Sequence, residues 1–385
     1  QAHSVLSQRM STLAGGAVST YLMKSSLTDY DWKWVSITAG GVSAALTSNA
    51  LSVLSQGVSV ISQQVSVLSQ QVSTLSQAIS TMIPMAPGGR LTLTTATPVL
   101  VVAVTAATVI YYTPYVHDYV PIYDGTNWKT FHVSEISITI DTTNHLSGKN
   151  YDLFVVNDAG TRRVGTGAAW TTDTARAEAL ARLNGIWTNN ASFTFRYSSI
   201  ATLTVAANRA TYVGTFRASA NGQTEFSFGG SPSVGGTEAK LYLWNCYHRV
   251  PTFAIVRDST DSYTYSTTAW RQANGSATMQ VSLVRGLNED AIDARYSGEC
   301  AAGTSSAVEV GVGIDSTTAA SGLIGHSNDT IANPLLSSYV GMLGLGYHFV
   351  AALENRGTGA NAGTFYGDAG DATLVQSGLA LLMPT

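Results

Sequence analysis

The acidic side chains in the second half of the chain are the first candidates for chemistry. Cleavage of a glycosidic bond requires two carboxylates about 5–9 Å apart, and the acids available for it are Asp258, Asp261, Glu289, Asp290 and Asp293. These acids lie in stretches typical of turns and strand ends, so we expect structural roles for them. The sequence therefore predicts no catalytic residue and a protein that is not an enzyme.

Histidine and acidic residues also lack a metal-binding pattern. The seven histidines are dispersed, and no HExxH motif or Cys/His pairing at zinc spacing occurs. Asp368 and Asp371 in YGDAGDA could ligate Ca²⁺, but the other ligand positions are absent and a turn is expected there. No Walker A loop, GxSxG motif or GxGxxG motif after a strand is present. We predict no metal and no cofactor.

Aromatic side chains are the remaining candidates for binding. The chain has 18 Tyr, 7 Trp and 10 Phe. Exposed aromatic rings stack on sugars or fill protein interfaces, whereas buried ones build a core, and we expect most of these to be core. The rings that lie beside turns are the predicted ligand-binding residues: Tyr115, Tyr119, Tyr123, Tyr263, Tyr265 and Trp270.

The charge content limits the partners of the chain. Lys and Arg number 20 and Asp and Glu 24, only 11% of the residues, and the net charge is -4. This balance does not fit a phosphate backbone, so no nucleic-acid binding is expected. The uncharged run from Val99 to Tyr112 is shorter than the ~18–20 apolar residues of a membrane-spanning helix. We therefore expect no membrane insertion.

A seven-residue repeat organises the region in front of these candidate sites. From Leu51 the chain reads LSVLSQG, VSVISQQ, VSVLSQQ and VSTLSQA, which places apolar residues at heptad positions a and d. VSV also alternates like a strand, but a period of two does not divide seven, so a helix is favoured. The predicted oligomerisation residues are Leu51, Leu54, Val58, Ile61, Val65, Leu68, Val72, Leu75, Ile79 and Met82.

The heptads also predict association between copies. No charged residue lies between Lys33 and Arg90, so ion pairs cannot set the register of a coiled coil. Val at a and Leu at d favour two strands, whereas Val53, Val60 and Val67 at position c widen the apolar face and favour three. We expect a homotrimer, with a dimer left open.

Sequence composition divides the chain into five regions. Residues 1–43 hold a coil fragment and an aromatic segment whose residues Tyr30, Trp32 and Trp34 suit either a small collar or a docking element. Residues 44–83 form the coiled-coil shaft, and the Pro/Gly-rich residues 84–90 a hinge. Two β domains are expected at 91–211 and 212–385, similar to β-sandwiches or jelly rolls, with one short helix at 172–184 that ends at Gly185.

The order of shaft, hinge and Gly-rich β head resembles the trimeric fibres of tailed bacteriophages. Longer segments such as YYTPYVHDYVPIYDGTNW, ATYVGTFRASANGQTEF and LWNCYHRV resemble a module of phage structural proteins, over roughly Arg90 to Thr385. The resemblance implies a virion component that is made in the bacterial host cytoplasm and mounted on tail or head. It supplies no catalytic residue.

The resemblance leaves three hypotheses for function. The first is a receptor-binding fibre that is held by other virion proteins through its N-terminal region and binds a host-surface glycan or protein through its head. The second is a head fibre, collar or decoration protein with a purely structural role. The third is a polysaccharide-degrading spike, which the sparse acids favour least.

Overall fold

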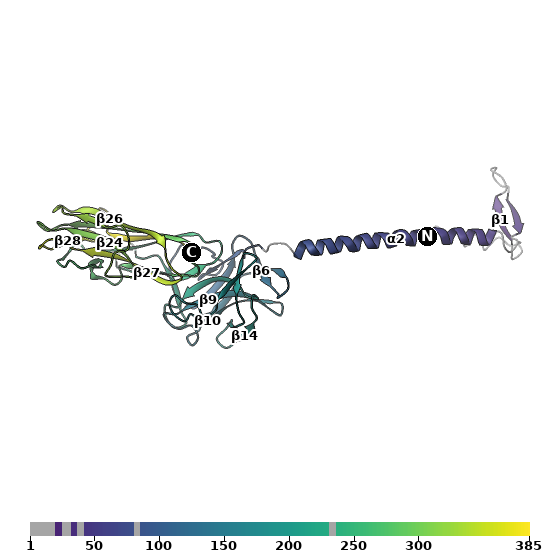
Figure 1. Ribbon diagram of the computed structural model, residues 1–385, viewed down its shortest axis with the longest axis horizontal. Helices are drawn as coiled ribbons and strands as arrows, with labels where there is room; N and C mark the ends of the chain where they lie inside the picture. Colours follow the sequence, from purple (N-terminus) through teal and green to yellow (C-terminus); the bar gives the residue numbers. More distant parts are fainter. Residues whose placement is uncertain (1–19, 25–31, 37–41, 81–84, 231–235) are drawn as a thin grey trace. The chain divides into compact units, whose positions relative to one another are not determined.

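The computed structural model describes residues 20–24, 32–36, 42–80, 85–230 and 236–385 (Figure 1). The chain divides into two units, residues 1–82 and 83–385, and each is described by itself. In the first unit β1 (Thr20–Lys24) pairs antiparallel with β2 (Trp32–Ser36). The predicted attachment residues Trp32 and Trp34 lie on β2, opposite Lys24 and Leu22. Tyr30 lies outside the described residues.

Helix α2 (Val42–Ser80) covers the heptad region with 39 residues, so the helical prediction is confirmed and the strand alternative is wrong. The a and d side chains from Leu51 to Leu75 are 59–70% exposed. Ile79 lies on α2, and Met82 lies outside the described residues. The segment Ser48–Leu75 is also long and apolar enough, with a mean hydropathy of 1.2, to cross a membrane by length and composition.

The second unit is built almost entirely of β-strands, as the Val-, Thr- and Tyr-rich runs predict. We name its large sheets I, II and III. Sheet I has the strand order β11-β12-β15-β9-β10-β13-β14, with β18 paired to β15. Its strands are β9 (Asn150–Asp158), β10 (Thr161–Ala169), β11 (Leu180–Leu183), β12 (Ile186–Asn189), β13 (Phe193–Arg196), β14 (Thr202–Val205), β15 (Thr211–Arg217) and β18 (Leu243–Asn245).

Two small sheets pack against sheet I through contacts such as β8 with β10 and β6 with β15. They have the orders β3-β5-β8 and β6-β7. Their strands are β3 (Gly89–Thr92), β5 (Val109–Pro114), β6 (Tyr119–Tyr123), β7 (Trp128–His132) and β8 (Ile136–Thr139). These contacts cover part of sheet I, and every residue of its strand β15 is buried.

Sheet II has the order β25-β24-β27-β22-β17-β16-β4, with β21 paired to β27. Its strands are β4 (Val104–Ala107), β16 (Thr224–Ser227), β17 (Ala239–Leu241), β21 (Arg271–Gln272), β22 (Gln280–Arg285), β24 (Val308–Ile314), β25 (Gly325–Ser327) and β27 (Gly346–Asn355). Only β17 and β22 pair in parallel among the described strands.

Sheet III faces sheet II and has the order β19-β29-β23-β28-β20, with β26 paired to β23. Its strands are β19 (Pro251–Arg257), β20 (Tyr263–Tyr265), β23 (Ala291–Ala301), β26 (Asn333–Met342), β28 (Gly363–Tyr366) and β29 (Gly378–Pro384). Leu379, Leu381 and Met383 alternate toward the core along β29. Figure 1 shows β24, β26, β27 and β28 gathered in one group and β6, β9, β10 and β14 in another.

The short helix expected at 172–184 is wrong. The segment runs irregularly from Thr172 and then forms the hairpin β11–β12, with Arg182 paired to Trp187. Asn184 and Gly185 have φ values of 50° and 87°, as a two-residue hairpin turn requires. The dipeptide that suggested a helix stop is thus the turn of a hairpin.

The domain boundary expected between residues 211 and 212 falls inside strand β15, which pairs with β9, and is not seen. The sheets also exchange strands across it. β4, from the first part of the unit, joins sheet II, and β18, from the second part, joins sheet I. Residues 83–385 accordingly form one compact unit.

Candidate functional site

The three predicted ligand-binding tyrosines of the first β region lie on or beside strands β5 and β6. Tyr115 follows β5 and is 43% exposed. The ring of Tyr119 is 4.2 Å from that of His132 and 5.7 Å from that of His117. Tyr123 lies 5.6 Å from Trp128 across the β6–β7 hairpin. The structure therefore places these rings along one hairpin and its entry.

Arg90 lies beneath this aromatic group. Its guanidinium carbon is 5.6 Å from the centre of the Tyr115 ring, and its nitrogens donate to the carbonyl oxygens of Pro98 at 2.9 Å, Thr385 at 3.0 Å and His248. Burial lowers the pKa of Arg90 to about 10, against a small opposing effect of Tyr115. Arg90 thus connects β3 through a hydrogen bond to Thr385, directly after β29.

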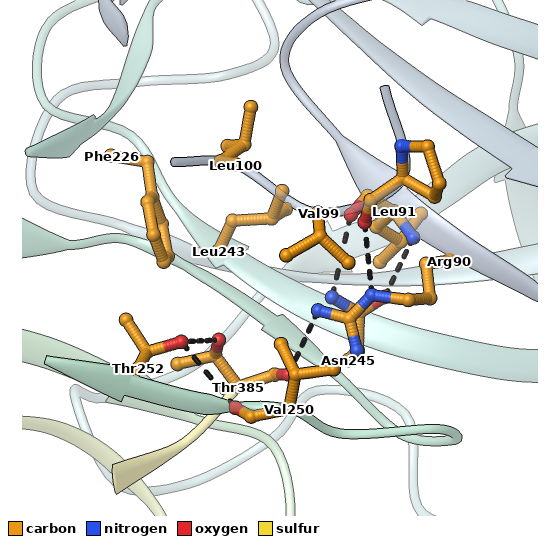
Figure 2. Close-up of a pocket in the computed structure, with 11 residues that line it drawn as sticks. Arg90, Leu91, Val99, Leu100, Phe226, Leu243, Asn245, Val250, Thr252 and Thr385 are labelled. Carbon is orange, nitrogen blue, oxygen red and sulfur yellow. Dashed lines mark hydrogen bonds between the residues drawn. The ribbon is translucent and has the colours of Figure 1, made fainter. Parts of the chain in front are cut away.

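A small cavity adjoins Arg90 and is lined by side chains such as Leu100, Phe226 and Thr252 (Figure 2). Its volume is about 10 Å³, which is at the lower limit for one water molecule. The cavity is therefore too small for a sugar or a cofactor. Its polar groups form hydrogen bonds that connect neighbouring segments.

Of the other predicted aromatic residues, Tyr263 and Tyr265 lie on β20 of sheet III, and Trp270 directly precedes β21 of sheet II. The hydroxyl of Tyr263 donates to Glu354 at 2.7 Å, and its ring stacks on Phe365 at 5.9 Å. Burial is the main cause that raises the pKa of Tyr263. The hydroxyl of Tyr265 donates to the carbonyl of Ala269 at 2.8 Å, and Arg271 covers its ring at 3.9 Å. Trp270 closes over Gly311, where an added Cβ would approach its ring to 2.9 Å. These rings are engaged in packing within the second unit.

The acids considered for hydrolysis take part in ion pairs and turns. Glu289 pairs with Arg182 and Arg249, and Asp290 pairs with Arg249 at 3.0 Å. Asp293 pairs with Arg295 at 2.7 Å. Asp258 accepts from the amide of Thr260. Asp368 and Asp371 accept from amides of their own turns, as expected, and no three His, Cys, Asp or Glu side chains among the described residues gather as metal ligands.

A polar groove of about 220 Å³, which the sequence did not predict, lies between β8 and β10. Glu135, Ile136 and Ser137 form one wall at the start of β8, and Arg162, Arg163 and Val164 form the other on β10. Tyr197, directly after β13, completes the lining. The only sequence signal for this groove is the pair of adjacent arginines in a chain with few charges.

The charges of the groove are held in place by their neighbours. Arg163 donates through Nε to Asp158 at 2.7 Å and lies 4.3 Å from the ring centre of Tyr197. Arg162 donates to the carbonyl of Gly160 and lies 5.9 Å from the ring centre of Phe131. Among the described residues no carboxylate forms an ion pair with Arg162, which lines the groove.

Glu135 supplies the opposite charge. It accepts hydrogen bonds from the amide of Ala96 at 2.6 Å, the hydroxyl of Thr113 at 2.5 Å and the hydroxyl of Thr95. Burial acts to raise the pKa of Glu135, but these hydrogen bonds outweigh it and the pKa is lowered. Glu135 is therefore ionised at neutral pH. The groove offers guanidinium donors, a carboxylate acceptor and the exposed hydroxyl of Ser137 to one ligand.

Comparisons with known proteins give no family. No family model and no curated protein matches the chain. Among solved structures it is similar to the insecticidal delta-endotoxin Cry8Ea1 from Bacillus thuringiensis, with a TM-score of 0.19 and 8% identity over 77% of this chain and 51% of that chain. The chain spans about half the length of the two delta-endotoxin structures that it matches.

Two other likenesses are equally distant. The structure of infectious bursal disease virus Gx strain gives a TM-score of 0.19 and 10% identity over 80% of this chain and 79% of that chain. The exo-beta-1,3-galactanase from Phanerochaete chrysosporium with galactose gives 0.16 and 9% over 79% and 99%. These TM-scores are too low to assign a fold family or a function to this chain.

Proposed function

We propose that this protein is a homo-oligomeric virion fibre whose helix α2 forms a coiled-coil shaft and whose β-rich unit is a head that binds a surface glycan. The observation that carries the proposal is the unpartnered apolar stripe of α2, exposed from Leu51 to Leu75. Isolated helices of Val and Ser are marginal in water. Association with further copies removes this stripe from solvent, with three strands favoured over two.

The stripe favours a coiled coil over a membrane span. Positions b, e and f of each heptad are Ser or Gln from Ser52 to Gln77, so polar residues occupy one whole side of α2. A helix surrounded by lipid would expose these Gln side chains to hydrocarbon, which is costly. A coiled coil turns them to water. Residues 1–43 precede the shaft, and we assign to them the attachment to other virion proteins.

The mass of the full chain in detergent-free buffer, measured by light scattering, tests the shaft. We expect a trimer, and replacement of both Val65 and Leu68 by Asn should raise the concentration needed for association. A matched control is Gln63→Lys on the polar side of the same helix, which should leave the mass unchanged. A full-length chain that is monomeric in the absence of detergent would contradict the proposal.

The groove formed by Glu135, Ser137, Arg162, Arg163 and Tyr197 is our proposed binding site. The guanidinium of Arg162, for which no ion pair is found among the described residues, suits a carboxylate, because arginine donates in a planar fork. Glu135 and Ser137 suit the hydroxyls of the same ligand. This combination fits a sugar that carries a carboxylate. Several identical sites on one fibre would turn a weak single contact into strong attachment.

Binding of D-glucuronic acid and of glucose to the full chain, followed by ligand-observed NMR, tests this site. We expect saturable binding of the acidic sugar, little binding of glucose, and an approximately tenfold or greater loss with Arg162→Gln, since one charge-assisted hydrogen bond contributes ~1.5–3 kcal/mol. Arg295→Gln, at an exposed arginine outside the groove, is the control. Equal binding of the two sugars would refute the assignment.

A further inference from the structure

The outer face of sheet III is unusually apolar for a surface that faces solvent. Four strands, β19, β29, β23 and β26, lie side by side in it. One cross-strand row joins Phe253, Leu382, Asp293 and Val340, which are paired in register. Phe253 is 60% exposed and Val340 69% exposed.

Neighbouring rows extend this face. Met342 is exposed at one end of β26 and Leu336, 60% exposed, near the other. Leu323, which bridges to Ser338 beside β26, is also exposed. Pro251, Ala291, Val340 and Leu382 border a groove of about 240 Å³ across the face. We call this surface, defined by Phe253, Leu336, Val340, Met342 and Leu382, the sheet III face.

The opposite side of the same strands is already the core. Ala254, Ala294 and Leu381, which alternate with the residues of the sheet III face, are buried. An antiparallel sheet with one solvated side ordinarily carries polar residues on that side. A group of exposed apolar side chains on one face of a protein this poor in charge indicates an interface.

The charges on the sheet III face identify the kind of partner. Asp293 and Arg295 pair with each other at 2.7 Å, so the face has opposite charges side by side and no net charge from them. Two such faces do not repel each other, and Arg295 of one copy can meet Asp293 of another. A nucleic acid or a strongly acidic or basic partner would find no complementary field here.

We infer that the sheet III face packs against another copy of this chain. The helix stripe independently favours a second copy as the neighbour, and the covalent connection to α2 raises the effective concentration of the heads. Aromatic and aliphatic residues at the centre of an interface contribute most of its binding energy. This interface goes beyond the proposed coiled coil, because it lies in the head and uses none of the heptad residues.

Light scattering over a concentration series on the full chain tests the inference. In a chain whose helix stripe is weakened by Val65→Asn and Leu68→Asn, we expect residual, concentration-dependent association. Adding Val340→Asp should weaken that association about 100-fold or more, because it buries an unpaired charge at the contact. Ile200→Asp, at an exposed apolar residue outside sheet III, is the matched control and should change nothing. Thermal melting checks that each variant is folded.

The outcomes separate this inference from the proposed function. A trimeric wild type whose stripe variant is monomeric at every concentration would overturn the sheet III interface and leave the coiled coil intact. A wild type that is monomeric would overturn both. Hydrogen exchange on the wild type gives a second measurement, since β19 and β26 should exchange more slowly in it than in the Val340→Asp variant.

Discussion

At the scale of single residues, several ionisable groups of the second unit are buried and have fixed partners. Arg176 donates to Asp152 at 2.7 Å and to the hydroxyl of Tyr212 at 3.1 Å, and Thr215 donates to Asp152 at 2.6 Å. Removing one member of such a buried pair leaves a charge without compensation, which costs more than the pair contributes. Each ion in this charge-poor chain is therefore important to local structure.

His145 is a buried titratable residue of this kind. Its Nδ1 accepts from the amide of Asp141 at 3.1 Å, and its Nε2 lies 3.1 Å from the hydroxyl of Thr166. An accepting Nδ1 requires the neutral ring. Burial is the main cause that lowers the pKa of His145, with Arg196 adding to it and the Asp141 carboxylate opposing it.

This arrangement predicts a pH dependence of stability. Because the folded pKa lies below the unfolded value of about 6.5, the unfolded chain binds more protons, and the free energy of unfolding falls as the pH falls from about 6.5 toward the folded pKa. His145→Gln should reduce this slope by up to about 1.4 kcal/mol per pH unit. Urea unfolding at a series of pH values measures it; an identical slope in the variant would contradict the assignment.

At the scale of elements, periodicity determined which predictions succeeded. The heptads of α2 specify a local 3.5-residue repeat, and such a pattern identifies a helix without knowledge of its neighbours. The segment 172–184 has good helix formers, but its structure is fixed by distant groups. Arg176 reaches Asp152 and the carbonyl of Gly286, and Asn184–Gly185 forms a hairpin turn. Tertiary contacts and turn geometry there override helix propensity.

The groove could not be predicted for a related reason. Glu135, Arg162 and Tyr197 come from three separate segments that only the packing of β8 against β10 brings together. Aromatic residues beside turns can be identified from the sequence, but their position does not show whether the ring is free to bind a ligand. Tyr115 is exposed, whereas the hydroxyl of Tyr263 is used by Glu354. A sequence shows that a ring lies beside a turn, but not which face of the sheet it occupies.

The hairpin turn at Gly185 gives a test at this scale. Its φ of 87° is in the left-handed region, and nothing lies within 4 Å of an added Cβ. Gly185→Ala should therefore lower the free energy of unfolding by about 1 kcal/mol through backbone strain alone. The same change at Gly57, inside α2, should instead stabilise the helix by about 0.8–1 kcal/mol. Equal signs for the two variants, measured by thermal and urea unfolding, would contradict these assignments.

At the scale of the whole molecule, the separation of charge matters. No charged residue lies between Lys33 and Arg90, whereas the second unit contains ion pairs such as Arg176–Asp152. Hydrophobic association is little affected by screening, and salts that are excluded from apolar surface strengthen it slightly. If α2 forms the proposed coiled coil, its association and ligand binding at the groove should therefore respond to salt in opposite directions.

This contrast can be measured on one sample. From about 50 mM to about 500 mM NaCl, the melting temperature of the helical circular-dichroism signal should stay constant or rise slightly, because α2 has no charged residue whose interactions salt could screen. Binding of glucuronic acid at the groove should weaken over the same range. A helical signal that melts earlier at high salt would indicate that charged residues outside α2 hold the copies together.

The exchange of strands between the sheets also sets the order in which the chain can fold during synthesis. Sheet I lacks β18 until residue 245 has left the ribosome, and sheet II already needs β4 from the start of the unit. Sheet III is completed only by β29, which inserts between β19 and β23, and Arg90 bonds to Thr385. Strands that are synthesised early, such as β4 and β19, therefore remain incompletely paired until their later partners have been synthesised. The second unit therefore depends on pairing between strands that are far apart in the sequence, and such long-range pairing is intrinsically slow.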